Sequence, residues 1–310
     1  MLDGFTPVPD DFATRYRARG YWLERSMGDY FREVFDRREG VAVVAGEERV
    51  AYRELGDRID HLARHLLELG IAPLDRVVVQ LPNRIEFIYL YFALLRVGAV
   101  PLMALPPHRQ YEIEHFVSFI EAVGYAAAAR EGELSFLEMA RKIRAAHPCM
   151  RHLFILGNDL PGDCHCLRAL METPPRTPAS ALDLLRIDPR QPAVFQLSGG
   201  TTGIPKIIPR THDDYIFNSV GCSAANDMRP SDCLLVCLPI GHNFPLASPG
   251  IQGMFIRGGR VVLADSPRAT DVLPLIERER VTHLELVPAI LIRLLHDDAM
   301  QLRGSLWPVA

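Results

Sequence analysis

Residues 196–206, with the sequence QLSGGTTGIPK, combine three glycines, three hydroxyl residues and one lysine in eleven positions. Small residues let backbone N–H groups come close to phosphate oxygens, hydroxyl groups add hydrogen-bond donors, and lysine supplies a positive charge. The segment is not a Walker loop, because proline precedes the lysine and isoleucine follows it, and it is not a GxGxxG motif. Its composition predicts phosphate binding, with a solvent-exposed glycine turn as the structural alternative. The residues expected to contact phosphate are Ser198, Gly199, Gly200, Thr201, Thr202, Gly203 and Lys206.

The lysine of this segment is unusual for the chain. Among the 34 Lys and Arg residues only Lys142 and Lys206 are lysines, and all the others are arginines. A lysine carries a compact charge on a flexible stem and can follow a moving phosphate, whereas arginine presents a rigid planar fork. The choice of lysine at position 206 therefore favours phosphate binding over a plain turn.

Apolar strands alternate with helices on both sides of this segment. Residues 75–83 and 193–198 are short apolar runs typical of strands, and residues 84–100 are predicted to form a mostly apolar helix. Such alternation predicts an α/β fold with layered, mainly parallel sheets and flanking helices. The phosphate segment directly follows strand 193–198, and ligands of α/β sheets gather beyond the carboxyl ends of strands. We expect one sheet subdomain over residues 1–190 and a second over 191–310.

Bulk composition excludes several classes of protein. The 310 residues are 48% hydrophobic and 23% charged, which is typical of a globular chain, and the net charge of −4 with no long Lys/Arg run argues against nucleic-acid binding. The sequence contains no run of about 18 apolar residues, so no membrane span is predicted and a cytoplasmic protein is expected. The six cysteines are too irregular for a disulfide framework. Cys164, His165 and Cys166 lack a second ligand pair at zinc-site spacing, so no metal site is predicted there.

The stretch LSGGTTGIPKIIPRTHDDY resembles the phosphate-binding signature of the adenylate-forming superfamily, which contains acyl- and aryl-CoA ligases, luciferases and peptide synthetase adenylation domains. Further patches match that family in the family's order: VAYRELGDRIDHLARHLLELGI, DRVVVQLPN, FALLRVGAVPLMALP and LPIGHNFPLASPG. The resemblance covers the chain from about Tyr21 to His296. It implies the large N-terminal domain of the adenylate-forming fold.

Within this superfamily, HNFPLASPG is similar to the aryl-acid pocket of 2,3-dihydroxybenzoate-AMP ligases of siderophore biosynthesis. The resemblance implies that Asn243 contacts the ortho hydroxyl and carboxylate side of the aryl acid and that Phe244 flanks the ring. It also implies that Ser248 faces the 3-position and that His242 belongs to the aryl-acid site and its gate. Salicylate-activating relatives tend to carry cysteine where Ser248 stands. An unpaired buried hydroxyl costs about 1–3 kcal/mol, so Ser248 favours dihydroxybenzoate, with salicylate as the alternative.

Each of these residues also has a purely structural interpretation. His242 is of a type that often caps a turn, Asn243 could form an Asx turn before Pro245, and Ser248 could cap a helix that begins near Pro249.

The resemblance implies a two-step reaction. The aryl carboxylate attacks the α-phosphate of ATP, pyrophosphate leaves, and the acyl group passes to the phosphopantetheine arm of an aryl carrier protein. The family uses ATP with Mg²⁺, which neutralises the leaving pyrophosphate, and the protein mainly positions the reactants and stabilises charge. Lys206 and His242 are the residues expected to take part in catalysis.

Motifs that the family carries further along do not occur in this sequence. They are a YGxTE-like motif that helps to hold magnesium, a TGD-like motif that grips the ribose, and a small C-terminal domain with a lysine required for adenylation. We therefore expect the 310 residues to be the N-terminal portion of such a ligase, with negligible ATP–pyrophosphate exchange on their own. A non-catalytic remnant that binds ATP or an aryl acid weakly is the alternative.

Overall fold

Two mainly parallel β-sheets form the frame of the protein. The computed structural model describes residues 2, 4–199 and 203–297. One sheet has the order β14 (His283–Leu284), β12 (Cys233–Val236), β13 (Arg260–Leu263), β1 (Val41–Ala45) and β2 (Glu48–Ala51). The other has the order β11 (Ile207–Thr211), β10 (Pro192–Leu197), β4 (Val100–Met103), β3 (Arg76–Gln80), β5 (Gly124–Ala128), β8 (His152–Leu156) and β9 (His165–Cys166). A short hairpin joins β6 (Arg130–Glu131) to β7 (Leu134–Ser135).

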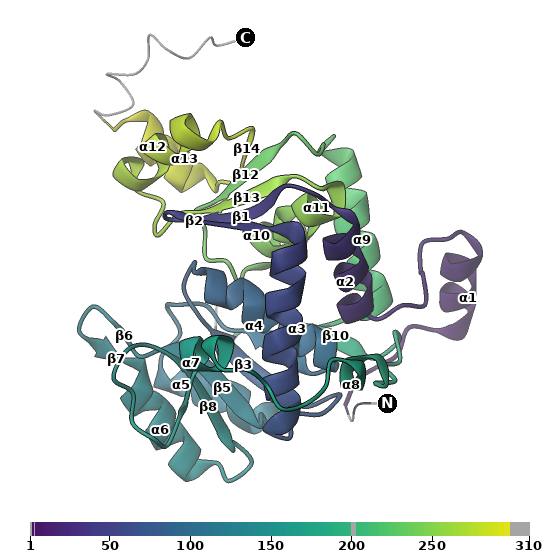
Figure 1. Cartoon of the computed structure of the whole chain (residues 1–310), viewed down its shortest axis with the longest axis vertical. Helices are drawn as coiled ribbons and strands as arrows, with labels where there is room; N and C mark the ends of the chain where they lie inside the picture. Colours follow the sequence, from purple (N-terminus) through teal and green to yellow (C-terminus); the bar gives the residue numbers. More distant parts are fainter. Residues whose placement is uncertain (1, 3, 200–202, 298–310) are drawn as a thin grey trace.

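Helices fill the space between the sheets and cover their outer faces (Figure 1). The helices of the middle layer are α2 (Met27–Arg37), α3 (Tyr52–Glu68), α4 (Ile85–Val97), α9 (His212–Ala225), α10 (Asn243–Ala247) and α11 (Gly250–Arg257). The outer face of the larger sheet packs on α5 (Gln110–Phe119) and α6 (Phe136–Ala146), and that of the smaller sheet on α12 (Ala269–Glu279) and α13 (Pro288–Leu295). The remaining helices are α1 (Asp10–Ala18), α7 (Leu167–Glu172) and α8 (Ser180–Asp183).

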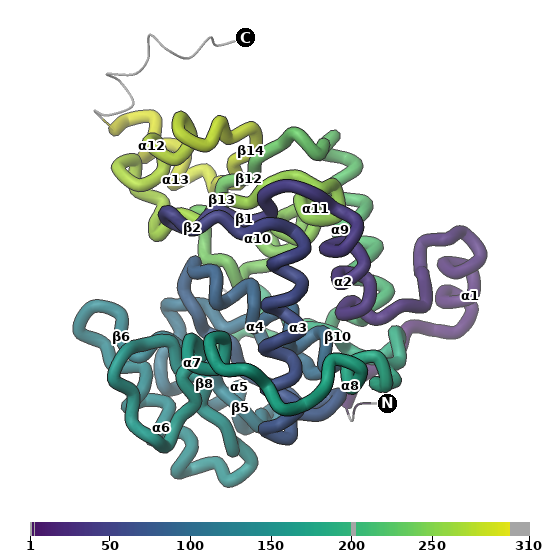
Figure 2. Tube along the Cα trace, viewed as in Figure 1, coloured from purple at the N-terminus to yellow at the C-terminus, as the bar shows by residue number. Residues whose placement is uncertain are grey.

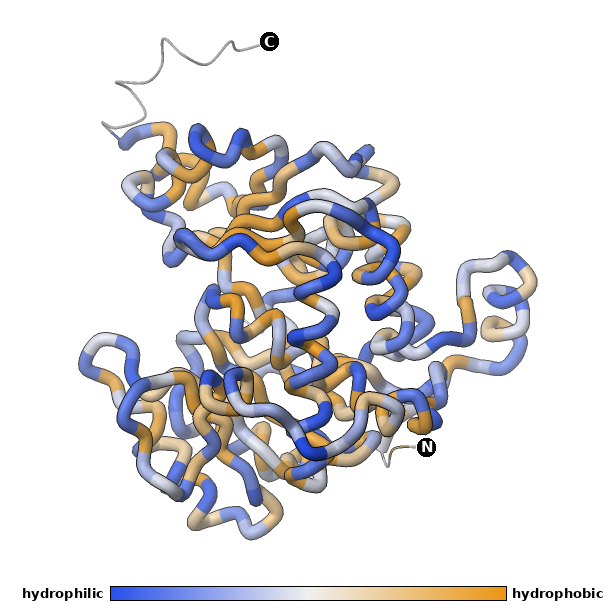
Figure 3. Tube along the Cα trace, in the orientation of Figure 1, coloured by the Kyte–Doolittle hydropathy of each residue, from blue (hydrophilic) through white to orange (hydrophobic). Residues whose placement is uncertain are grey.

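Strand side chains alternate between the middle layer and the outer layers. Val43 packs into the core between the sheets, whereas its neighbour Val44 packs under α12 and α13. Val77 and Val78 divide in the same way between the middle core and the core beneath α5 and α6. Because both faces of each sheet are covered, the central strands are mainly apolar, as in CLLV of β12 and VVL of β13, and the middle of the smaller sheet is largely orange in Figure 3.

The mixed α/β architecture confirms the fold expected from the sequence. The mostly apolar helix predicted at 84–100 is α4, and the structure buries all of its residues. The strands before and after residue 190 do not form separate sheets, in contrast to the two sheet subdomains expected from the sequence. Strands β1 and β2 belong to the smaller sheet, where Val43 pairs with Val261, while β10 and β11 complete the larger one. Figure 2 shows β1 beside β13, although some 200 residues separate them, so the boundary at 190 does not separate the two sheets.

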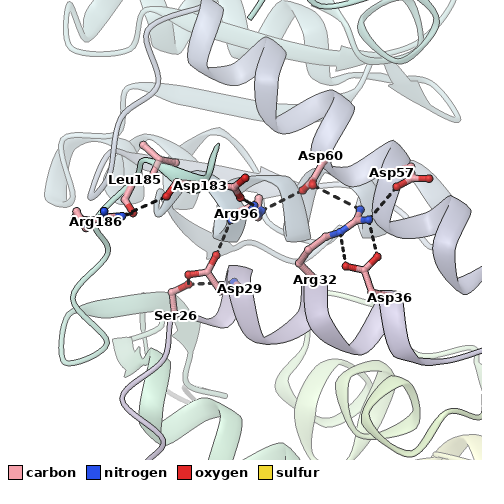
Figure 4. A network of polar contacts seen from close by, with 10 residues as sticks. All are labelled: Ser26, Asp29, Arg32, Asp36, Asp57, Asp60, Arg96, Asp183, Leu185 and Arg186. Atoms are coloured by element: carbon pink, nitrogen blue, oxygen red, sulfur yellow. Dashed lines mark hydrogen bonds and ion pairs between the residues drawn. The ribbon is translucent and has the colours of Figure 1, made fainter. Parts of the chain in front are cut away.

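A network of charged residues ties the helices of the middle layer together (Figure 4). Arg96 lies on α4, is buried, and contacts three carboxylates: Asp29 at 2.6 Å, Asp60 at 3.1 Å and Asp183 at 2.8 Å. These partners come from α2, α3 and α8. One arginine therefore joins four helices, and its charge is compensated despite its burial. The described residues contain no helix long and apolar enough to cross a membrane.

Candidate active site

The predicted phosphate segment closes a hairpin between β10 and β11. The Ser198 N–H donates to the Lys206 carbonyl at 3.0 Å, and the Lys206 N–H donates to Ser198 Oγ at 2.9 Å. A Cβ atom on Gly199 or Gly203 would meet no atom of the described residues within 4 Å. Packing of the described chain thus does not require these glycines. The other predicted phosphate contacts, Gly200, Thr201 and Thr202, lie outside the described residues.

Asn83 fixes the chain that leads into the predicted aryl pocket. Its buried side-chain amide donates to the carbonyls of Leu238 at 2.9 Å and Ala264 at 3.1 Å, and its oxygen accepts from the Ile240 N–H at 2.9 Å. Asn83 follows β3 of the larger sheet, whereas Leu238 and Ala264 follow β12 and β13 of the smaller one. Asn83 therefore joins the carboxyl ends of both sheets and sets the position of His242, two residues beyond Ile240.

A chain of hydrogen bonds connects the strand before the phosphate segment to the aryl pocket. Gln196 Nε2 donates to the Tyr215 hydroxyl at 3.0 Å, and that hydroxyl donates to Asn243 Oδ1 at 2.8 Å. Gln196 and Tyr215 are buried, and burial raises the pKa of Tyr215, which therefore stays protonated. The two predicted parts of the site, Ser198 with its neighbours and Asn243 with its neighbours, are thus linked through buried side chains.

Ser248 accepts hydrogen bonds from two amide side chains. Asn243 Nδ2 donates to Ser248 Oγ at 2.9 Å and Asn218 Nδ2 donates at 3.1 Å, while Asn218 also donates to the Ala247 carbonyl at 2.7 Å. Because both amides donate to the serine oxygen, the serine proton remains to donate elsewhere. Helix α11 has Pro249 at its N-cap and no side-chain cap, so Ser248 does not have the capping role considered from the sequence.

His242 does have the capping role considered for it. It is the N-cap of α10, and its Nδ1 accepts from the Phe244 N–H at 3.2 Å. Partial desolvation lowers the pKa of the His242 imidazole, which favours the neutral ring near pH 7. A neutral ring that accepts at Nδ1 carries its proton on Nε2, so this edge is a hydrogen-bond donor. Phe244, two residues further along, is half-buried.

No metal centre is formed by the protein side chains that the structure describes. Across residues 4–199 and 203–297, no group of three or more His, Cys, Asp or Glu side chains could hold an ion. The imidazole of His165 lies 3.2 Å from that of His152, and the thiols of Cys164 and Cys166 donate to backbone carbonyls.

Several residues of the site were not predicted from the sequence. Gln196, Tyr215 and Asn218 hold Asn243 and Ser248 in place, and Glu285, directly after β14, accepts a hydrogen bond from the Gly250 N–H of the same segment. Tyr215 and Asn218 lie on α9, which Thr211 caps by accepting from the Asp214 N–H at 3.2 Å. Their role depends on α9 packing beside α10, which a sequence pattern does not specify.

Known proteins resemble this chain over most of its length. A family model described as AMP-binding enzyme matches residues 31–306. The chain is 44% identical to triostin synthetase I of Streptomyces triostinicus, over 94% of this chain and 53% of that protein. It is 40% identical to the 2,3-dihydroxybenzoate-AMP ligase of Bacillus subtilis, over 94% and 52% of the two chains. It is 41% identical to the salicyl-AMP ligase / salicyl-S-ArCP synthetase of Mycobacterium tuberculosis, over 93% and 51%.

A solved structure agrees with these matches. The apo structure of MbtA from Mycobacterium smegmatis superposes with a TM-score of 0.86 at 36% identity, over 94% of this chain and 54% of that one. The chain spans about half the length of the curated relatives it matches. The resemblance to the N-terminal portion of aryl-acid AMP ligases is confirmed, whereas dihydroxybenzoate and salicylate ligases are similarly close. The chain therefore belongs to the AMP-binding enzyme family.

Proposed function

We propose that this chain binds ATP and an aryl acid side by side, for adenylation of the aryl carboxylate. The observation that carries the proposal is the hydrogen-bonded chain from Gln196 through Tyr215 to Asn243, since it links the strand before the phosphate segment to the predicted aryl pocket. Holding two reactants in fixed geometry is the main contribution a protein makes to such a reaction. Relatives named as aryl-acid AMP ligases support this activity.

In this proposal Lys206 and the loop glycines contact the triphosphate. The Lys206 side chain is exposed and has no ion-pair partner in the described part of the chain, so its charge is available to a phosphate. Ser198 and Gly203 flank the tip of the hairpin in the sequence and are proposed to take part in the same contacts. Magnesium would accompany the triphosphate, but the described side chains provide no three-ligand cluster for it, and no step is assigned to it.

In the same proposal the aryl acid lies against α10. Asn243 faces the carboxylate and ortho substituent, and Phe244 flanks the ring. The Nε2–H of His242 donates to an oxygen of the substrate, because the neutral ring offers a donor rather than a charge. The activated acyl group would then pass to the phosphopantetheine thiol of an aryl carrier protein, as the name of the salicyl-S-ArCP synthetase suggests for that relative.

The substrate is proposed to be 2,3-dihydroxybenzoate rather than salicylate. Ser248 Oγ already accepts two N–H bonds, so its own proton is available to a 3-hydroxyl oxygen. Replacing Ser248 with cysteine is expected to shift the ratio of the two dissociation constants towards salicylate by about tenfold, since an unpaired buried hydroxyl costs about 1–3 kcal/mol. Isothermal titration of the 310-residue chain with each acid measures this ratio.

The exposed Ser118, replaced by cysteine, is the matched control and is expected to leave the ratio unchanged. If Ser248→Cys also leaves the ratio unchanged, Ser248 does not contact the substrate. If neither acid binds to the wild-type chain, the proposed function itself is wrong.

A further inference from the structure

Glu285 is a buried carboxyl group with one oxygen that no hydrogen bond satisfies. It is 8% exposed and follows β14, at the carboxyl end of the smaller sheet. Its Oε1 accepts from the Gly250 N–H at 2.9 Å, whereas its Oε2 is buried and has no hydrogen-bond partner among the described residues. A buried carboxyl oxygen without a partner is costly, and such groups in natural proteins call for an explanation. Burial raises the pKa of Glu285 to about 7.

The donor to Glu285 belongs to the same turn as the proposed aryl pocket. Gly250 follows Ser248 by two residues and has a φ of +51°, a conformation that favours glycine. A Cβ atom on Gly250 would come within 2.4 Å of the Pro245 carbonyl oxygen and 2.8 Å of the Phe244 carbonyl oxygen. The backbone that holds Glu285 is thus packed directly on the backbone of Phe244, the residue assigned to the ring of the aryl acid.

The hydroxyl of Ser248, two residues before the Gly250 that donates to Glu285, is chemically complementary to the free oxygen of Glu285. Two amides donate to Ser248 Oγ, so the serine can act only as a donor to a ligand. A phenolic hydroxyl that accepts the serine proton still has its own O–H to donate, and a carboxylate is a strong acceptor for it. Glu285 therefore offers the acceptor that a hydroxyl group bound to Ser248 would need.

We propose that Glu285 is a specificity-determining residue that accepts a hydrogen bond from the 3-substituent of the aryl acid. This inference rests on the proposed function. It restricts the substrate class to aryl acids whose 3-substituent both accepts and donates, such as a hydroxyl or a primary amine. Aryl acids with a methoxy group there are disfavoured, because the oxygen can accept from Ser248 but has no proton for Glu285. A site that requires a substrate donor rejects analogues lacking it, since its own buried group is left unpaired.

The test is isothermal titration of the 310-residue chain at pH 8, where the Glu285 carboxylate predominates, with 2,3-dihydroxybenzoate and 2-hydroxy-3-methoxybenzoate. The wild-type chain is expected to prefer the dihydroxy acid by about tenfold or more, the effect of one unpaired buried group. Glu285→Gln keeps an oxygen for the Gly250 N–H but presents an N–H where the free carboxylate oxygen was. The preference should therefore disappear or reverse in this variant. The exposed Glu131, replaced by glutamine, is the matched control and should keep the wild-type ratio.

The outcomes separate the inference from the function on which it rests. If Glu285→Gln binds both acids with the wild-type ratio, the carboxyl group only holds Gly250 and the inference is wrong. A wild-type chain that binds both acids equally well also overturns it, while the proposed function stands. Absence of binding to either acid overturns the proposed function and the inference together. Thermal unfolding of each variant establishes that the compared proteins are folded.

Discussion

Replacing Asn243 with alanine is expected to weaken binding of 2,3-dihydroxybenzoate by about 100-fold, since the variant loses a direct substrate contact and leaves buried polar groups unpaired at about 1–3 kcal/mol each. The Tyr215 hydroxyl loses its acceptor at 2.8 Å, and Ser248 loses one of its two amide donors. Isothermal titration of the purified variant measures the change in dissociation constant.

Asn226→Ala is the matched control for this prediction. The Asn226 side chain is exposed at the end of α9 and, among the described residues, donates to the Cys222 carbonyl of its own helix at 2.9 Å. Its replacement should leave aryl-acid binding unchanged. If Asn243→Ala binds the acid as tightly as the wild type, the hydrogen-bonded chain through Tyr215 has a structural role alone.

Replacing Arg96 with alanine is expected to lower the free energy of unfolding by about 3–5 kcal/mol, the usual cost of removing one partner from a buried ion pair. The Arg96 guanidinium contacts Asp29, Asp60 and Asp183. Desolvation raises the pKa of Asp60 above its usual value, and the guanidinium groups of Arg96 and Arg32 offset part of that rise. Without Arg96, the half-buried Asp60 carboxylate loses its main compensation and α4 loses its ion pairs to α2 and α8. Urea denaturation monitored by circular dichroism measures the loss.

Arg190→Ala provides the comparison on the surface. Arg190 pairs with Asp188 at 3.0 Å, and its side chain is 58% exposed. Solvent screens such pairs, so its removal should change the free energy of unfolding by less than about 1 kcal/mol. Equal losses in the two variants would mean that the Arg96 network contributes no more than an ordinary surface ion pair.

The order of helices and strands could be predicted from the sequence, but the pairing of distant strands could not. Apolar runs such as Val77 to Val79 predict buried strands because both faces of a parallel sheet are covered. Nothing local specifies that Val43 lies beside Val261, because this pairing depends on how the middle helices fill the space between the sheets. For the same reason, the subdomain boundary expected at residue 190 does not separate the strands of one sheet from those of the other.

The candidate site could be predicted in part for a similar reason. Asn243 and Ser248 lie in one short motif, so their resemblance to a known pocket was visible in the sequence. Tyr215 and Asn218 act on them from another helix, and only the packing of α9 on α10 brings the four side chains together. Glu285 did leave a signal, since it is the one carboxylate in the predicted strand THLELV and stands between two leucines, but its contact with Gly250 depends on tertiary structure.

The central claim is that the hairpin around Lys206 binds the phosphates of ATP, and the two lysines of the chain allow a direct test. An amine-reactive acetylating reagent is applied with and without ATP, and peptide mass spectrometry then measures the modification of Lys206 and Lys142 separately. Lys142 is exposed on α6 and serves as an internal control in the same molecule. At an ATP concentration about ten times the dissociation constant, roughly nine-tenths of the sites are occupied, and modification of Lys206 should fall by about tenfold. Modification of Lys142 should not change. Equal modification of Lys206 with and without ATP, up to millimolar ATP, would contradict the assignment of this hairpin to phosphate binding.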